Sequence, residues 1–302
     1  MVAAVGPYFQ KFVKRWPTVH HLARASLDDV LRMWAGLGYY RRARSLHQCA
    51  RIICAEYDGQ FPPDEKTLIK LPGFGAYTAA AVAAIAFDQR ANVVDGNVER
   101  VVARIFALRA PLPKAKKALR DAAAKLLPAD RFGDYAQALM DLGATICTPR
   151  NPKCALCPWN DRCRANKLGI AARLPRKTKP ANKPVRCAIA FALFNRKGEL
   201  FLRQRPPEGL LGGMMEIPSS AWEERKPPKL ADVIKYAPVP TNWRLLPEPV
   251  THVFSHFKLN IQIAVGTTTH AAKGWWVNPD KLDNEALPSV MLKIAHRAVE
   301  GL

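Results

Sequence analysis

The chain of 302 residues is long enough for two modest domains. Lys and Arg total 46 against 25 Asp and Glu, and this net charge of +21 favours a polyanionic partner, nucleic acid in preference to an acidic membrane. No apolar stretch has the length needed to cross a bilayer, no export signal is visible, and seven cysteines are too few for a disulfide-built secreted domain. We therefore expect a soluble, cytoplasmic protein without membrane contacts.

The first half of the sequence has a helical period. Apolar residues recur at helical spacing from Val5 to about Cys163, and in the segment 98–108 Val98, Val101 and Val102 fall on one face. This period predicts an all-helical first domain.

Two glycines separated by one residue, Gly73 and Gly75, precede an alanine-rich helix that we expect to run to about Phe87. Glycines leave the backbone unobstructed, so these amides and those at the start of the helix can bind a phosphate. The segment resembles a DNA-binding helix-hairpin-helix element, and an ordinary Pro/Gly turn is the alternative.

Asp95 stands just before the next predicted helix and has two compatible interpretations. Aspartate is a favoured N-cap residue, and its charge interacts well with the helix dipole. A carboxylate near a hairpin that fixes the DNA backbone can also stabilise positive charge on a sugar whose base is leaving. The second interpretation is the chemistry of a glycosylase.

Four cysteines follow in the spacing C-x6-C-x2-C-x5-C, namely Cys147, Cys154, Cys157 and Cys163. One close pair flanked by two wider arms is typical of a [4Fe–4S] cluster, whereas a structural zinc site usually presents two separated pairs. The spacing therefore predicts a [4Fe–4S] cluster, with zinc as the alternative. The remaining cysteines have apolar neighbours, and we expect them to be small buried residues.

The composition changes between Arg164 and Arg186, where eight Lys or Arg and three prolines occur without an acidic residue. Such a segment is typical of a linker. Beyond it, the runs 186–194 and 199–204 flank a turn, and residues 257–265 alternate in hydrophobicity, which indicates strands. We predict a helical domain over 1–142, a cluster loop over 143–168, a basic linker over 169–185 and a strand-rich domain over 186–302.

The hairpin, the Val-Asp-Gly-Asn-Val motif at 94–98, and the Asp-Leu-Gly-Ala motif at 141–144 that leads into the cysteines occur in the order found in MutY-type adenine DNA glycosylases. The sequence resembles this family over nearly its whole length. The resemblance implies an all-α helix-hairpin-helix glycosylase domain with an iron–sulfur loop, followed by an α+β Nudix-like domain. It also implies a monomer that hydrolyses the N-glycosidic bond of adenine opposite 8-oxoguanine or guanine in double-stranded DNA.

The resemblance assigns roles to single residues. Asp95 stabilises an oxocarbenium-like sugar, while Tyr77 and Asn97 arrange the site around it. Endonuclease III-type relatives, which are bifunctional nucleases, have a lysine where this sequence has Tyr77, so we expect no Schiff-base nucleophile and no efficient strand cleavage. Tyr39 resembles the wedge that enters the duplex beside the base opposite adenine, with core packing as the alternative.

The family also uses a glutamate as general acid to protonate adenine. That residue lies upstream of the family segment that Met1–Phe9 matches, and it has no counterpart in this sequence. Two functions are therefore compatible with the sequence: an adenine glycosylase, and a catalytically impaired protein that binds lesion-containing DNA.

In the second domain, Phe254, Ser255 and His256 match the loop with which the family recognises 8-oxoguanine. This base has an N7–H donor where guanine has an acceptor, so a hydroxyl such as that of Ser255 can discriminate between them. An exposed, alternating strand edge is the alternative. Two prolines interrupt the segment 223–228, where a Nudix hydrolase needs a helix with patterned glutamates, so we expect recognition instead of hydrolysis.

Overall fold

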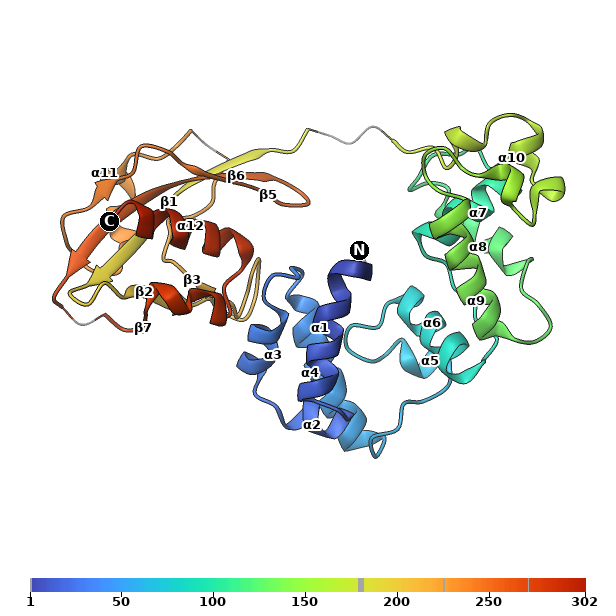
Figure 1. Cartoon of the computed structure of the whole chain (residues 1–302), viewed down its shortest axis with the longest axis horizontal. Helices are drawn as coiled ribbons and strands as arrows, with labels where there is room; N and C mark the ends of the chain where they lie inside the picture. The colour runs from blue at the N-terminus through green and yellow to red at the C-terminus, as the bar shows by residue number, and fades with distance from the viewer. Residues whose placement is uncertain (1, 179–181, 225, 271) are drawn as a thin grey trace. The chain divides into compact units, whose positions relative to one another are not determined.

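The computed structural model describes residues 2–178, 182–224, 226–270 and 272–302 (Figure 1). The chain forms two compact units, one made of Met1–Cys54 with Ala181–Leu302 and the other of Ala55–Pro180. None of the described helices combines the length and the apolar character that a membrane span requires.

The described residues before Val185 form helices and turns, as their period predicts. Ser26, Asp64 and Asp95 each accept a backbone N–H at the start of a helix, which satisfies donors that the helix itself leaves unpaired. The α-helices are α1 (Val2–Arg15), α2 (Val19–Arg24), α3 (Leu27–Trp34), α4 (Arg41–Glu56), α5 (Glu65–Leu68), α6 (Ala76–Phe87), α7 (Gly96–Ile105), α8 (Lys116–Ala124), α9 (Phe132–Asp141) and α10 (Arg164–Lys167). A π-helical turn η1 (Leu142–Ile146) and short 3-10 turns η2 (Cys154–Leu156), η3 (Asn160–Arg162) and η4 (Ala171–Arg173) complete this part.

The second half is built around one sheet, which confirms the predicted strand-rich domain. The strands lie in the order β3-β2-β1-β6-β4, while β5 pairs with β6 and β7 pairs with β2. Strands β1 and β6 run parallel along their whole lengths. The strands are β1 (Val185–Asn195), β2 (Leu200–Gln204), β3 (Met215–Glu216), β4 (Arg244–Leu245), β5 (Val250–Val253), β6 (Lys258–Thr268) and β7 (Trp275–Val277). The other elements are α11 (Leu230–Val233), η5 (Ile234–Tyr236), η6 (Pro279–Asn284) and α12 (Ser289–Glu300).

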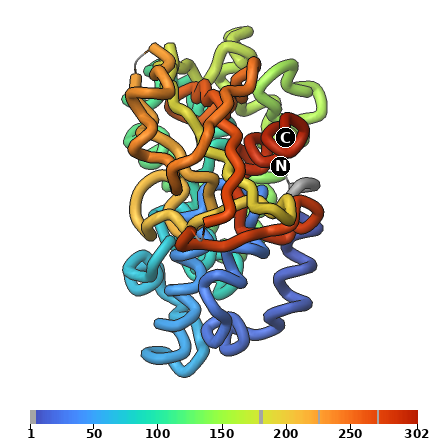
Figure 2. The backbone as a smooth tube through the Cα atoms, turned by 90° about the vertical axis from the view of Figure 1, so that its left-hand side faces the viewer, coloured from blue at the N-terminus to red at the C-terminus, as the bar shows by residue number. Residues whose placement is uncertain are grey.

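The alternation predicted for β6 is correct, because Leu259, Ile261 and Ile263 are fully buried beneath α12. Helix α12 lies against the strands of its own unit, as Figures 1 and 2 both show. Of the described residues between Ile217 and Pro228 none is helical, so this segment has no helix that could carry the patterned glutamates of a Nudix hydrolase.

The compact units divide the chain differently from the predicted domains. Val30, Leu31 and Ala43, on α3 and α4, are buried in the same apolar cluster as the residues of β1, β6 and α12. Burial of these side chains against the sheet groups the first helices with the C-terminal half. The helical period of residues 27–56 shows which face is apolar and does not show what covers it.

Part of the predicted linker is packed. Ala171 and Leu174 are buried with Ala165 near two of the cluster cysteines, and the N–H of Leu112 donates to the carbonyl of Arg176 at 2.9 Å. The expectation that residues 169–185 form a linker is therefore wrong up to about Arg176, because a few apolar side chains suffice to hold a basic segment on the helical unit. Residues 179–181 of this segment lie outside the described residues.

Candidate functional site

Asp95 is the N-cap of α7, as one interpretation of the sequence predicted. Its Oδ1 accepts the backbone N–H groups of Asn97 at 2.8 Å and Val98 at 2.7 Å, and its Oδ2 accepts the amide of Asn97 at 3.0 Å. The side chain remains partly exposed. Three N–H donors thus fix the carboxylate at the positive end of the helix dipole, and a substrate can still reach it.

Tyr77 lies close enough to Asp95 to be affected by its charge. Burial raises the pKa of the Tyr77 hydroxyl, and the Asp95 carboxylate raises it further. The hydroxyl contacts the sulfur of Met140 at 3.6 Å, and the residue is 44% exposed. Tyr77 is therefore a neutral phenol at physiological pH, able to donate a hydrogen bond beside the carboxylate.

The hairpin leaves the start of α6 open. Gly73 has φ +83°, in the left-handed region that favours glycine, and Gly75 is the N-cap of α6 without a side-chain hydrogen bond. A Cβ at Gly75 would have no neighbour within 4 Å. The first N–H groups of α6 are consequently uncapped by a side chain at an exposed turn, which suits an anion.

Arg100, which the sequence analysis missed, joins this site to the cysteine loop. Its guanidinium donates to the Asn97 amide oxygen at 2.8 Å, to the Gly143 carbonyl at 2.5 Å and to the Cys147 carbonyl at 2.7 Å. Burial lowers its pKa, and the nearby Arg104 cation adds to this effect. Arg100 therefore links the amide that holds Asp95 to the backbone of the first cluster cysteine.

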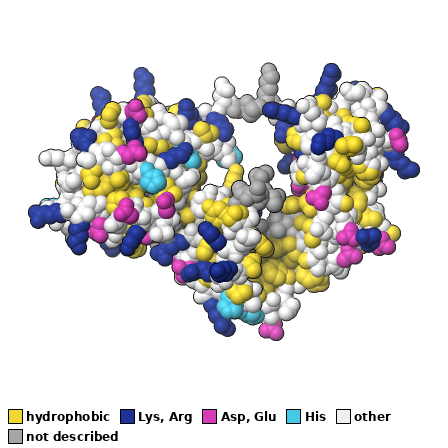
Figure 3. Space-filling view, in the orientation of Figure 1, with side chains coloured by type: hydrophobic (Ala, Val, Ile, Leu, Met, Phe, Trp, Pro, Cys, Tyr) yellow, Lys and Arg dark blue, Asp and Glu magenta, His cyan; other side chains and the backbone are white. Residues whose placement is uncertain are grey.

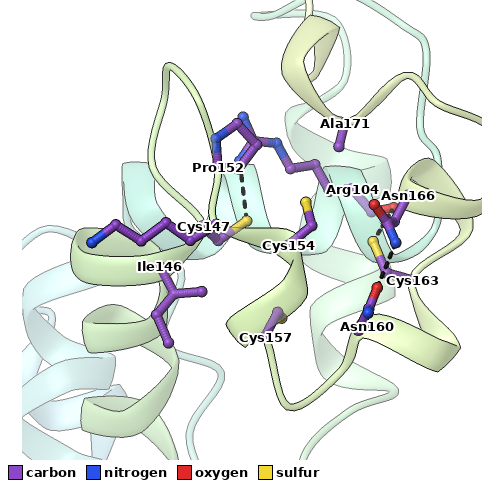
Figure 4. A pocket seen from close by; sticks show the side chains of 11 residues that line it. Arg104, Ile146, Cys147, Pro152, Cys154, Cys157, Asn160, Cys163, Asn166 and Ala171 are labelled. Atoms are coloured by element: carbon purple, nitrogen blue, oxygen red, sulfur yellow. Dashed lines mark hydrogen bonds between the residues drawn. The ribbon is translucent and has the colours of Figure 1, made fainter.

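The four cysteines line one hollow together with Arg104 and Asn166 (Figure 4). Burial raises the pKa of the Cys154 and Cys157 thiols, and neighbouring thiols add to it, so a thiolate here needs a positive partner. Among the described residues no three Cys, His, Asp or Glu side chains converge as a site for a single ion. Four thiols around a hollow fit a multinuclear cluster better than one zinc ion.

Arg104 is a second residue that sequence reasoning missed. It is 1% exposed, and its Nη1 donates to the Cys147 sulfur at 3.1 Å and to the Thr148 carbonyl at 2.9 Å. Its Nε donates to the Leu174 carbonyl at 3.1 Å. The available signal was the pair of arginines four residues apart on the helix that follows Asp95, which lie on one face of α7.

The 8-oxoguanine candidates lie on a hairpin turn, which replaces the alternative of an alternating strand edge. Strands β5 and β6 pair up to Val253 and Lys258, and the four residues between them form the turn. Ser255 and His256 are exposed at its tip, while Phe254 is half-buried. The Ser255 hydroxyl hydrogen-bonds with the Tyr39 hydroxyl, the two oxygens lying 2.8 Å apart.

The two adjacent tyrosines have different surroundings. Tyr40 is 5% exposed and belongs to the core, whereas Tyr39 is 70% exposed with φ +49°. Such a backbone conformation is costly for a bulky residue and is often found at functional sites. Core packing therefore accounts for Tyr40, and Tyr39 is free to contact a ligand.

Lys and Arg side chains occur on the surfaces of both units (Figure 3). In the cysteine loop, Arg150, Lys153 and Arg162 carry positive charge near the cluster. This distribution agrees with the polyanionic partner expected from the net charge.

Three family models match successive parts of the chain: the HhH-GPD superfamily of base excision DNA repair proteins over 1–129, the iron-sulfur binding domain of endonuclease III over 147–163, and the NUDIX domain over 189–297. The adenine DNA glycosylase of Rattus norvegicus is 34% identical over 352 residues, which cover 97% of this chain and 68% of that protein. This chain belongs to the adenine DNA glycosylase family. The predicted family and fold class are thus confirmed.

Other members of the family differ in how much of them the chain matches. The Homo sapiens adenine DNA glycosylase is 34% identical over 97% of this chain, which spans 64% of the human protein. The relative from Mycolicibacterium smegmatis is 46% identical over 57% of this chain and 58% of its own length. The iron–sulfur match covers all four cysteines, so the cofactor of this chain is a [4Fe–4S] cluster, which these four side chains would hold.

Proposed function

We propose that this chain removes adenine opposite 8-oxoguanine or guanine from double-stranded DNA by monofunctional hydrolysis of the N-glycosidic bond. The observation that carries the proposal is the Asp95 carboxylate, fixed by three N–H donors at an accessible helix start and next to a neutral phenol. Membership of the adenine DNA glycosylase family supports the choice of adenine.

In this mechanism, Asp95 stabilises the positive charge that develops on the deoxyribose as adenine leaves. A carboxylate held by preorganised donors needs no rearrangement during the reaction, and this lowers the barrier. Asn97 holds the carboxylate through its side-chain amide, and Tyr77 helps to arrange the site around it. The site has no lysine at position 77, so water attacks C1′ of the deoxyribose as adenine leaves, the abasic sugar stays in the strand, and no Schiff base forms.

The hairpin would bind the DNA backbone next to the lesion. Uncapped N–H groups at the start of α6 can each bind a phosphate oxygen, and a phosphate can approach because Gly73 and Gly75 have no side chain. Adenine must leave the base stack to reach Asp95, and this costs less at a mismatch. A fixed backbone makes such extrusion selective for the nucleotide beside the hairpin.

For the opposite base, we propose that the Ser255 hydroxyl accepts the N7–H of 8-oxoguanine and that Tyr39 inserts beside that base. Support comes from the exposed hairpin tip and from the bond between the two hydroxyls, which would orient the serine oxygen. Unmodified guanine offers an acceptor at N7, so it would gain less from this contact.

A second candidate is a protein that binds the lesion without efficient catalysis. It is favoured by the partners of Asp95: among the described residues these are N–H groups of Asn97 and Val98, and none is a carboxylic acid that could protonate adenine. Recognition of the DNA would be retained.

Single-turnover release of adenine separates the two candidates. The chain, with its cluster verified by visible absorbance, is mixed with a duplex carrying adenine opposite 8-oxoguanine, and the binding of the same duplex is measured in parallel. Asp95→Asn is the control, because asparagine is an equally good N-cap and should leave the fold intact. Release that Asp95→Asn abolishes supports the glycosylase; tight binding without release supports the second candidate.

A further inference from the structure

The hairpin that carries Ser255 rests on a group of aromatic rings. Phe254 and Phe257 stack with their centroids 4.5 Å apart and their planes at 20°, and the Phe254 N–H donates to the Phe257 carbonyl at 2.9 Å. The Trp222 ring lies beside both, with its centroid 5.8 Å from that of Phe254 and 6.4 Å from that of Phe257. Ring pairs at these distances stabilise each other beyond their buried area. The exposed tip therefore has a rigid aromatic base.

Trp222 is itself oriented by two polar neighbours. Its Nε1–H donates to the Ser219 hydroxyl at 3.0 Å, and the guanidinium of Arg205 lies over the indole ring, 5.5 Å from the centroid. A cation over the face of tryptophan is attracted to the electrons of the ring. These contacts restrict the tilt of the indole, which is one of three rings beside Phe254, together with Phe257 and His252.

Arg205 is held in turn by a buried carboxylate. Glu216 on β3 has a side chain only 4% exposed, and it accepts hydrogen bonds from Arg205 and, at 2.7 Å, from Arg203. The Nε of Arg205 also donates to the Leu210 carbonyl at 3.2 Å. A buried carboxylate is costly without such partners, so Glu216 keeps the guanidinium fixed on the sheet.

We propose that Trp222, oriented by Arg205 and Glu216, is a positioning residue for recognition of 8-oxoguanine. It fixes Phe254, and through the turn it holds the Ser255 hydroxyl where it meets N7–H. This inference rests on the proposed function, since Ser255 must contact that base. Removing the indole loosens the turn, and a loose hydroxyl contacts the base in only part of the ensemble.

Loss of the Trp222 indole should affect the preference for 8-oxoguanine more than the overall affinity for DNA, because the contacts of Lys and Arg with the DNA backbone stay in place. Trp222→Leu is the disruptive variant. Trp222→Phe is the conservative one, because a phenyl ring still stacks on Phe254 and still accepts the Arg205 cation. Trp275→Leu is the matched control: this tryptophan on β7 is 53% exposed, and no ring contact connects it to the hairpin among the described residues.

Two quantities are measured on the cluster-loaded chain. The first is a ratio of two dissociation constants, measured with duplexes in which a non-hydrolysable 2′-fluoro adenine nucleotide faces guanine or 8-oxoguanine. The constant for the guanine duplex is divided by that for the 8-oxoguanine duplex. The second, in the absence of DNA, is the rate of hydrogen exchange of the Phe254 amide. We expect Trp222→Leu to lower the ratio about tenfold, the value of one hydrogen bond, and to accelerate exchange. Trp222→Phe and Trp275→Leu should resemble the wild type.

An unchanged ratio in Trp222→Leu overturns the inference, as does an equal loss in Trp275→Leu. If the wild type shows no preference for 8-oxoguanine, the proposed recognition by Ser255 fails. Hydrogen exchange then still tests the positioning: unchanged exchange in Trp222→Leu refutes it, and accelerated exchange supports it. Failure of the positioning and failure of the proposed function are therefore distinguishable.

Discussion

Replacing Gly143 by alanine tests how tightly the site around Asp95 is packed. A Cβ at this position would lie 2.6 Å from the Cβ of Asn97 and 3.1 Å from its carbonyl oxygen, whereas carbon atoms in contact lie about 3.5–4.0 Å apart. Because η1 and α7 are both held by Arg100, neither can withdraw without losing hydrogen bonds. We expect Asn97 to move.

Overpacking of this kind costs about 1–3 kcal/mol. With a typical dependence of the unfolding free energy on urea concentration, the urea concentration at the unfolding midpoint should fall by about 1 M. Cluster absorbance is the appropriate signal, because the cysteines belong to the same compact unit as Gly143. Displacement of Asn97 also weakens its 3.0 Å bond to the Asp95 carboxylate, so any adenine release should slow about tenfold.

Gly96→Ala, one residue before Asn97, is the matched control for stability. A Cβ there has no neighbour within 4 Å, and alanine is a better helix former than glycine. Its midpoint should stay level or rise. If Gly143→Ala unfolds at the same urea concentration as the wild type, or if Gly96→Ala is destabilised equally, the argument from close packing is wrong.

Three further predictions follow from single contacts. Arg104→Met should reduce the iron and sulfide bound per chain, because the buried donor to a cluster thiolate is lost. Arg162→Met, which changes an exposed arginine, should leave the iron and sulfide content unchanged. Burial raises the pKa of the Cys49 thiol from its ordinary 9 to about 11, so its contribution to stability is complete below pH 9 and is lost as the pH rises towards 11. Alanine at this position should therefore flatten the fall in unfolding free energy measured between pH 8 and 10, a fall of about 1.3 kcal/mol from this thiol; an unchanged slope would contradict the assignment. Tyr39→Phe and Ser255→Ala should each weaken binding of the 8-oxoguanine duplex, with the double variant no weaker than the worse single one, because the two hydroxyls hydrogen-bond with each other.

Local patterns predicted most of the fold. The helical period of the first half and the alternation in β6 reflect burial within single elements, so they are visible without knowledge of the partner. The four cysteines were equally accessible to sequence reasoning, because their spacing within one short loop fixes which of them can share a cluster. The order of motifs then gave the family.

The buried arginines show where such reasoning ends. Arginine on a helix is ordinarily exposed, so the spacing that places Arg100 and Arg104 on one face of α7 does not show that this face is buried. Their partners are mostly backbone carbonyls in segments about 40 to 70 residues further along the chain, at Gly143, Thr148 and Leu174. A carbonyl has the same chemistry in every residue, so no pattern of side chains identifies it as an acceptor.

The contact between Tyr39 and Ser255 has a similar origin. The resemblance nominated each residue, yet the two are 216 positions apart, and their hydroxyls meet only because α3 and α4 bury their apolar faces against the sheet. The turn between β5 and β6 determines how far Ser255 lies beyond the end of the strands, and the left-handed backbone at Tyr39 turns the tyrosine ring outward. A hydrogen bond that depends on a core, a turn and one unusual φ follows from the assembled unit and cannot be inferred from any one of these segments alone.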